Sequence, residues 1–198
     1  MSELLLRNTL GVLKKSSVLS QIVIVSSDDR AEKIARMNDV EYLREESDSG
    51  VNAAISRADD YSCEMGADAT IVIPQDLPLL TNSALDAVCR KAEGQERCLV
   101  ICPSIRYDGS NALLRKPSDV MRTFYENDSF NAHMRFAKKL KIALKVFLSD
   151  RIMIDLDTIE DVRILVERRT ANGPAAYLKS KARDATIART QIMRTLRK

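Results

Sequence analysis

Two apolar segments of this chain each lead into aspartate. Residues 70–73 precede Asp76, and residues 151–154 precede Asp155 and Asp157. Such short β-branched runs predict strands buried on both faces, and ligands of open α/β sheets bind outside the carboxyl ends of the strands. In phosphate chemistry Mg²⁺ is held by one or two carboxylates together with substrate oxygens. Asp76 with Asp155 or Asp157 therefore indicates metal-assisted transfer of a nucleotidyl or phosphoryl group.

Both acidic motifs also have a purely structural interpretation. Asp76 could cap a helix, and Asp157 or Thr158 could be the N-cap of a helix whose first turn holds Glu160 and Asp161. Capping explains the last two acids well but explains Asp155 poorly. If the strand continues, Asp155 and Asp157 lie on the same side, and two carboxylates together repel unless a cation lies between them.

Two further segments could bind an anion. The sequence Gly109-Ser110-Asn111 lies between two predicted strands, where it is either an ordinary turn or a source of amide and hydroxyl donors. A helix beginning at Ser129 carries His133, and a helix start is a natural anion site. A lone histidine is more often structural than catalytic.

The elements that must position these residues alternate between strand and helix. Residues 26–29 resemble a capping box and Thr81 or Asn82 resembles an N-cap. This alternation predicts an α/β fold whose mainly parallel sheet has helices on both faces. We expect helices at 3–15, 29–37, 51–66, 82–93, 118–125, 129–140, 158–169 and beyond 173, and strands at 21–27, 40–43, 69–73, 97–103, 112–115, 143–148 and 151–155.

Composition restricts the classes of protein to consider. The 198 residues suit one domain, which we place at 1–178, and no run is apolar enough to predict a membrane helix. The four cysteines lack a CxxC pair, which favours reduced thiols in a cytoplasmic protein without a zinc site. A basic tail follows at 179–198, and its scattered charges argue against nucleic-acid binding. The sequence leaves a homodimer open.

Taken together and in order, five motifs resemble one family, the 2-phospho-L-lactate guanylyltransferases of coenzyme F-420 biosynthesis. Those enzymes are GT-A-like nucleotidyltransferases. The resemblance extends from about residue 4 to about residue 178, and the motifs are 50–54, 76–80, 110–113, 129–133 and 155–161. It implies a three-layer α/β/α domain with a mostly parallel mixed sheet.

The resemblance also implies a reaction. A phosphorylated three-carbon acid, either 2-phospho-L-lactate or phosphoenolpyruvate, attacks the α-phosphate of GTP and releases pyrophosphate. Asp76 and Asp155 would be catalytic and, with Asp157, would hold Mg²⁺. The resemblance further implies that the nucleoside is contacted by Gly50, Asn52 and Ala53. It implies that the acceptor is contacted by Ser110, Asn111, Ser129 and His133.

The chain departs from the family in three places. The family begins with a strand and a basic loop that grips the triphosphate, and we expect residues 1–20 to supply neither. Its two glycines and threonine are replaced by Asp108-Gly109-Ser110, and Glu126 replaces a glycine near the acceptor. The donor base and the activity of this exact polypeptide therefore stay open. Two alternatives also stay open: another GT-A nucleotidyltransferase, such as a sugar-phosphate or molybdenum-cofactor relative, and a non-catalytic nucleotide-binding remnant.

Overall fold

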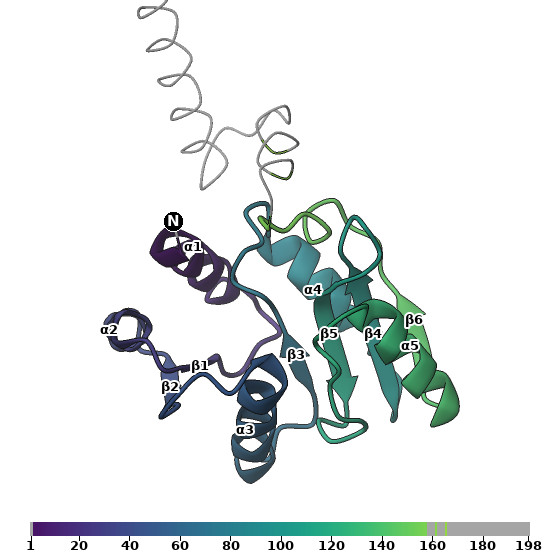
Figure 1. The fold of residues 1–198 in the computed structure, drawn as a ribbon. Coiled ribbons are helices and arrows are strands. Elements are labelled where there is room, and N and C mark those ends of the chain that lie inside the picture. The colour runs from purple at the N-terminus through teal and green to yellow at the C-terminus, as the bar shows by residue number, and fades with distance from the viewer. Residues whose placement is uncertain (1, 158–160, 162–164, 166–198) are drawn as a thin grey trace, which may run out of the picture.

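The structure, a computed structural model, describes residues 2–157, 161 and 165 of the chain (Figure 1). Helices and strands alternate through most of this part, as the sequence predicts. The helices are α1 (Ser2–Leu13), α2 (Asp29–Met37), α3 (Val51–Glu64), α4 (Asn82–Arg90) and α5 (Ser129–Lys139). The strands are β1 (Val23–Ser26), β2 (Glu41–Arg44), β3 (Thr70–Val72), β4 (Cys98–Pro103), β5 (Ser110–Lys116) and β6 (Ala143–Val146).

The larger sheet has the strand order β3-β5-β4-β6. β5 runs antiparallel to both β3 and β4, and β6 runs parallel to β4. Three of these four strands therefore share one direction, and the predicted mixed, mostly parallel sheet is confirmed. Within the described residues, β1 and β2 form a separate parallel pair that is not hydrogen-bonded to this sheet.

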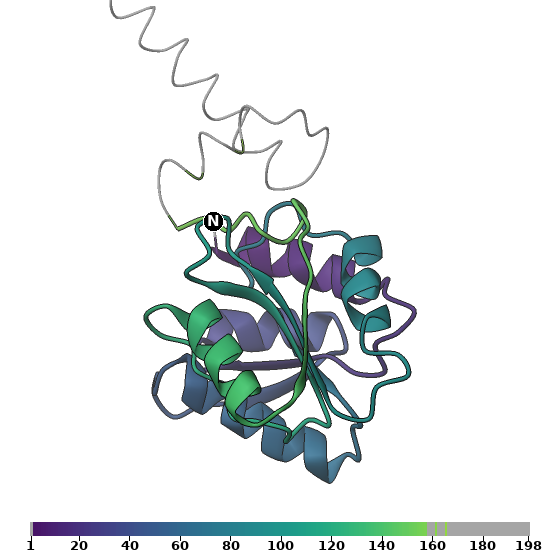
Figure 2. The same cartoon turned by 90° about the vertical axis from the view of Figure 1, so that its right-hand side faces the viewer.

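Strand β4 explains why the sheet has helices on both faces. Its even-numbered residues belong to one core cluster with Val88 of α4, and Leu99 and Ile101 belong to another with Phe130 of α5. Successive side chains of a strand point to opposite faces, so a continuous apolar run requires two covers. Figure 2 shows α4 and α5 on opposite sides of the strands. The predicted three-layer arrangement is confirmed here.

The predicted helix at 118–125 is wrong, since this segment consists of turns, bends and irregular backbone. Its backbone groups are bound by side chains instead of by a helical ladder. Arg115 Nη1 donates to the carbonyl of Met121 at 3.3 Å, and the amides of Phe124 and Tyr125 donate to His133 and Asn52. Tertiary hydrogen bonds thus replace the local ones that a helix requires.

The predicted strand at 151–155 is also wrong, because the segment forms a turn that continues into an irregular loop. The amides of Ile152 and Met153 both donate to the carbonyl of Ser149 at 2.9 Å. Of the helix predicted at 158–169, the structure describes only residues 161 and 165, both of them helical. The helix predicted beyond 173 and the basic tail lie outside the described residues. In the part of the chain that the structure describes, no helix has the length and apolarity needed to cross a membrane.

Candidate active site

Asp76 lies in the loop that follows β3. This loop is fixed on both sides: Thr9 of α1 donates its hydroxyl to the carbonyl of Gln75 at 3.1 Å, and Thr81 caps α4 by accepting from the amide of Ala84 at 3.3 Å. Leu77, between them, is fully buried. Asp76 is therefore presented from a rigid connection, and its buried Oδ1 has no hydrogen-bond partner.

Asp155 reaches the same region from a loop that is tied to the sheet. The side-chain amide of Asn111 on β5 donates to the carbonyl of Ile152 at 3.0 Å, and the amide of Ile105 donates to the carbonyl of Met153 at 2.7 Å. Asp155 is only 8% exposed, and its Oδ1 is also buried without a hydrogen bond. Asn111, predicted to contact the acceptor, thus uses its side-chain amide to hold the segment that carries Asp155.

The electrostatics of both carboxyls reflect burial. Loss of solvent raises the pKa of Asp76 and the pKa of Asp155 above the ordinary value, because a buried charge is poorly solvated. The negative charge of Asp157 raises both pKa values further, and Asp76 itself raises that of Asp155. Asp157 therefore lies near enough for its charge to act on both of the other carboxyl groups.

Arg106 is a residue of this site that the sequence motifs did not predict. It follows β4 and directs its guanidinium at the acidic loop, where Nη1 donates to Asp161 at 3.0 Å and Nη2 donates to Asp157 at 3.2 Å. Asp108 at 3.5 Å and Asp155 at 3.9 Å complete its acidic surroundings. Its position in the sequence could have indicated a role, since it follows a buried strand. Ligands of open α/β sheets bind outside the carboxyl ends of such strands.

These carboxylates suit a divalent cation that is shared with a ligand. Among the described residues, no group of three or more histidine, cysteine, aspartate or glutamate side chains is arranged to hold a metal ion. Mg²⁺ does not require such a cage, because it usually binds one or two carboxylates and takes its other ligands from water and phosphate. The two buried, unpartnered oxygens of Asp76 and Asp155 are donors of the kind it uses.

Ser110, Ser129 and His133 form one buried network. The amide of Phe124 donates to His133 Nε2 at 2.9 Å, so Nδ1 carries the proton and donates to the Ser110 hydroxyl, also at 2.9 Å. The Ser129 hydroxyl donates to Ser110 at 3.1 Å. Burial, aided by the charge of Arg115, lowers the pKa of His133 to about 4. The structure thus brings these three predicted residues together, with a neutral imidazole fully buried behind the two serines.

The residues predicted to lie beside a nucleoside are at the start of α3. Gly50 is the N-cap, with a φ of 88° that strongly favours glycine. Asn52 uses its side chain to hold Tyr125: Nδ2 donates to the carbonyl at 3.0 Å, and Oδ1 accepts from the amide at 2.7 Å. Ala53 is exposed. Gly50 and Ala53 are therefore accessible, whereas the Asn52 amide has a structural partner.

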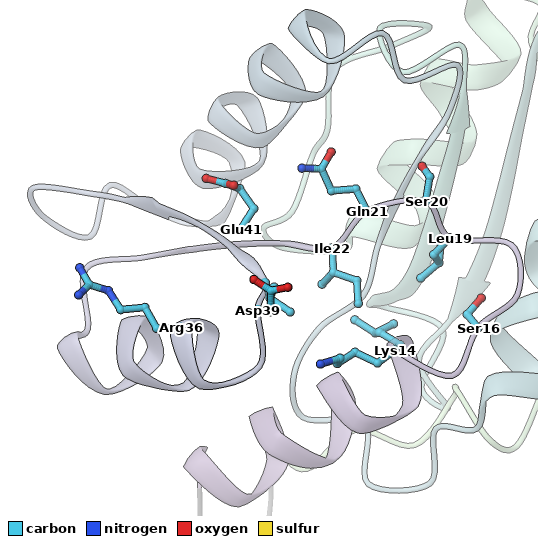
Figure 3. A pocket seen from close by; sticks show the side chains of 11 residues that line it. Lys14, Ser16, Leu19, Ser20, Gln21, Ile22, Arg36, Asp39 and Glu41 are labelled. Carbon is cyan, nitrogen blue, oxygen red and sulfur yellow. The ribbon is translucent and has the colours of Figure 1, made fainter.

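A cavity of about 610 Å³ lies elsewhere, near the C-terminal end of α1 and the starts of β1 and β2 (Figure 3). The charged residues at its rim are exposed, and none of the aspartates discussed above lines it. We place the candidate site at the carboxylates, because buried oxygens without partners point to a ligand and exposed charges do not. The cavity is lined by Leu13, Lys14, Ser16, Leu19, Ser20, Gln21, Ile22, Arg36, Asp39, Val40 and Glu41.

The fold belongs to a known class of α/β domains. The chain superposes on a protein from Desulfovibrio desulfuricans G20, provisionally described as a nucleotide-diphospho-sugar transferase, with a TM-score of 0.73. The match covers 95% of this chain and 84% of the other at 13% sequence identity. An identity this low supports the fold alone, and it agrees with the predicted GT-A-like nucleotidyltransferase domain.

Within that class the family is clear. The family described as "Guanylyl transferase CofC like" matches residues 2–195, so the chain belongs to it. The phosphoenolpyruvate guanylyltransferase of Rubrobacter xylanophilus is 30% identical over 178 residues, 90% of this chain and 83% of the relative. The 2-phospho-L-lactate guanylyltransferase of Methanocaldococcus jannaschii is 30% identical over 176 residues, 89% of this chain and 76% of the relative. The predicted family and enzyme class are confirmed.

Proposed function

We propose that this guanylyltransferase transfers GMP from GTP to 2-phospho-L-lactate or phosphoenolpyruvate, releases pyrophosphate, and serves coenzyme F-420 biosynthesis in the cytoplasm. Membership of the guanylyl transferase family supports the reaction, and the printed substrates of two relatives support the acceptor class. The observation that carries the proposal is the pair of buried carboxylate oxygens on Asp76 and Asp155 that have no hydrogen-bond partner in the protein.

In this proposal Asp76 and Asp155 hold Mg²⁺, with Asp157 at the exposed side of the site. The cation would neutralise negative charge on the phosphoryl group in transfer. The two aspartates lie on separate loops, each fixed by hydrogen bonds that do not use its carboxyl group. Each carboxylate is thus held in place before ligands bind, which reduces the cost of ordering the site.

The acceptor is assigned to the network of Ser110, Ser129 and His133. The Ser110 hydroxyl accepts from Ser129 and His133, so its own proton can be donated to a phosphate or carboxylate, and both serines lie near the start of α5, where the helix dipole favours an anion. His133 and Asn111 act behind them, because both ring nitrogens of His133 and the side-chain nitrogen of Asn111 are bonded to protein groups. Gly50 and Ala53 lie beside the nucleoside, and Asn52 shapes that side of the site through Tyr125.

The chemistry needs little from an acid or base. A phosphate oxygen of the acceptor attacks the α-phosphorus of GTP, a new P–O bond forms, and the bond to the oxygen bridging the α- and β-phosphates breaks. The attacking phosphate is already ionised at neutral pH, and pyrophosphate leaves with the electron pair. Catalysis then depends on alignment and on neutralising charge.

The test is pyrophosphate release with Mg²⁺, GTP and each of the two acceptors. The assay uses the chain as given and, in parallel, the chain together with whatever residues its reading frame encodes upstream of Met1. We expect Asp76→Asn and Asp155→Asn to lower kcat at least a hundredfold, on the order of the loss seen when one group that stabilises a transition state is removed. Asp60→Asn on the exposed face of α3 is the matched control and keeps full activity.

Two results would contradict the proposal. One is the absence of pyrophosphate release from both forms with GTP and any phosphorylated three-carbon acid. The other is turnover that survives Asp155→Asn at the level of the Asp60→Asn control. A preference for another nucleotide with the same acceptors would correct the donor while leaving the carboxylate site in place.

A further inference from the structure

Arg106 lies in an acidic cluster and offsets only part of its negative charge. Four carboxylates face its guanidinium: Asp108, Asp155, Asp157 and Asp161. Burial opposes a charge on Arg106, yet the four aspartates, Asp155 first among them, raise its pKa. The guanidinium thus acts as a cation for this loop, and the cluster as a whole stays negative.

The contacts of Arg106 are unevenly shared among these carboxylates. Asp161 and Asp157 receive hydrogen bonds at 3.0 and 3.2 Å, but Nη2 lies 3.9 Å from Asp155 Oδ1 and makes no hydrogen bond to it. Asp155 is more than nine-tenths buried, and that oxygen is unpartnered. The guanidinium therefore occupies the charge position beside Asp155 without using its oxygen, which leaves a ligand position for another cation.

The backbone of the loop that carries Arg106 is fixed by hydrogen bonds that do not involve the guanidinium. The amide of Ser104 donates to the carbonyl of Gly109 at 2.8 Å, and the Ser104 hydroxyl donates to Asp108 at 2.7 Å while it accepts from Gly109 N at 3.1 Å. The Arg106 side chain itself is 39% exposed. A long, half-exposed side chain on a fixed loop can turn away without disturbing the fold.

We propose that Arg106 is a resident counter-cation that competes with a divalent cation for Asp155 and Asp157. This inference rests on the proposed function, which places Mg²⁺ at these carboxylates. Because the guanidinium holds Oδ2 of Asp157 and lies 3.9 Å from Oδ1 of Asp155, a divalent cation that takes both carboxylates as ligands must overcome the repulsion of this positive charge or displace it. Free cation is then bound less tightly than the carboxylates alone would allow. Removing Arg106 should tighten the binding of a metal ion.

Binding of Mn²⁺ alone, followed by the electron paramagnetic resonance signal of the free ion, tests this without turnover. We expect Arg106→Met to lower the Kd for Mn²⁺ about fivefold, a size set by the modest strength of half-exposed ion pairs. Arg106→Lys keeps the charge and should have a Kd closer to that of the unaltered protein. If Arg106 only ties the two loops together, its loss would loosen the site and weaken Mn²⁺ binding, the opposite sign.

Arg44→Met is the matched control. Arg44 is also half-exposed and bridges two carboxylates, Asp29 and Glu32, each at 2.6 Å, in a separate part of the fold. It should leave the Kd for Mn²⁺ unchanged. Thermal melts of all variants in EDTA verify that each is folded before its Kd is compared.

The outcomes separate this inference from the proposed function. Asp155→Asn should abolish the Mn²⁺ site in the unaltered protein, and if it does not, the assignment of the cation is wrong. If Asp155→Asn abolishes the site while Arg106→Met binds Mn²⁺ no more tightly than Arg44→Met, the cation assignment stands and the role given to Arg106 is overturned. Tightening in Arg106→Met, and little in Arg106→Lys, supports the competition.

Discussion

Two arginines of this protein differ in how many carboxylates face them and in how deeply they are buried. Arg115 on β5 is 1% exposed and forms a two-pronged pair with one partner, Asp59 of α3, at 2.5 and 2.7 Å. It also donates to Thr70 at 3.1 Å and to the carbonyl of Met121 at 3.3 Å. Arg106 is half-exposed and faces four carboxylates, with a single hydrogen bond to each of two.

The difference separates a structural arginine from one available for function. The Arg115–Asp59 pair balances its charge and has two-pronged geometry, with the arginine buried and the Asp59 carboxylate only partly exposed, so it fixes α3, β3 and the 121–125 segment around β5. The Arg106 cluster carries an excess of negative charge and is partly exposed to solvent. A charge held in that way can exchange partners when a cation or an anionic ligand arrives.

The largest effect on stability should come from Arg115. We expect Arg115→Met to lower the free energy of unfolding by about 3 kcal/mol, the low end for breaking a buried pair, because Asp59 keeps some contact with water. Arg106→Met should change it by less than about 1 kcal/mol. Urea unfolding followed by circular dichroism measures both variants.

These two substitutions are chemically identical, so each serves as the control for the other. Equal losses in the two variants would show that exposure and charge balance do not distinguish the clusters. A larger loss for Arg106→Met would reverse the comparison and make the acidic loop the structural element.

The second predicted effect concerns His133, because the charge of Arg115 also acts on the pKa of this buried histidine. Burial and then Arg115 lower the pKa of His133 to about 4, whereas a histidine of the unfolded chain titrates near 6.5. As pH falls, the unfolded chain takes up the proton first. The stabilising contribution is therefore complete above about pH 6.5 and is lost toward pH 4, by about 2 kcal/mol between pH 8 and pH 5.

His133→Gln isolates this contribution, since the acidic groups titrate alike in both proteins. We expect stability to fall less steeply with decreasing pH in the variant, when unfolding curves are compared from pH 8 to pH 5. Parallel pH dependences in the two proteins would mean that His133 is not held neutral. The buried network with Ser110 would then need another explanation.

The sequence predicted those features that depend on local pattern. The helix at 29–37 and the cap at Thr81 are confirmed because they rest on neighbouring residues, although the cap of α2 is Asp28, which accepts from the amide of Arg30, and not Ser26. Cys98 and Cys102 are buried on β4. All four cysteines are free, as predicted.

The errors lie where distant side chains determine the backbone. Apolar residues at 151–155 suggested a strand, but the segment is held by Asn111 and by the amide of Ile105. The segment predicted as a helix at 118–125 is instead held by hydrogen bonds with the side chains of Arg115, His133 and Asn52. Arg106 was missed for the same reason. Nothing near it in the sequence is acidic except Asp108, and its other partners are about fifty residues away.

The smallest expected effect is the coupling within each cluster, measured by double-mutant cycles. Arg106→Met with Asp157→Asn should show an interaction energy of at most about 0.5 kcal/mol, because both side chains are solvated. Salt of about 1 M, where charges are screened beyond roughly 3 Å, should remove it. Arg115→Met with Asp59→Asn should give a larger coupling that salt barely changes, since the pair is shielded from solvent. A salt-resistant coupling between Arg106 and Asp157 would mean that this guanidinium is held as firmly as that of Arg115. A divalent cation could then not displace the Arg106 guanidinium from Asp157.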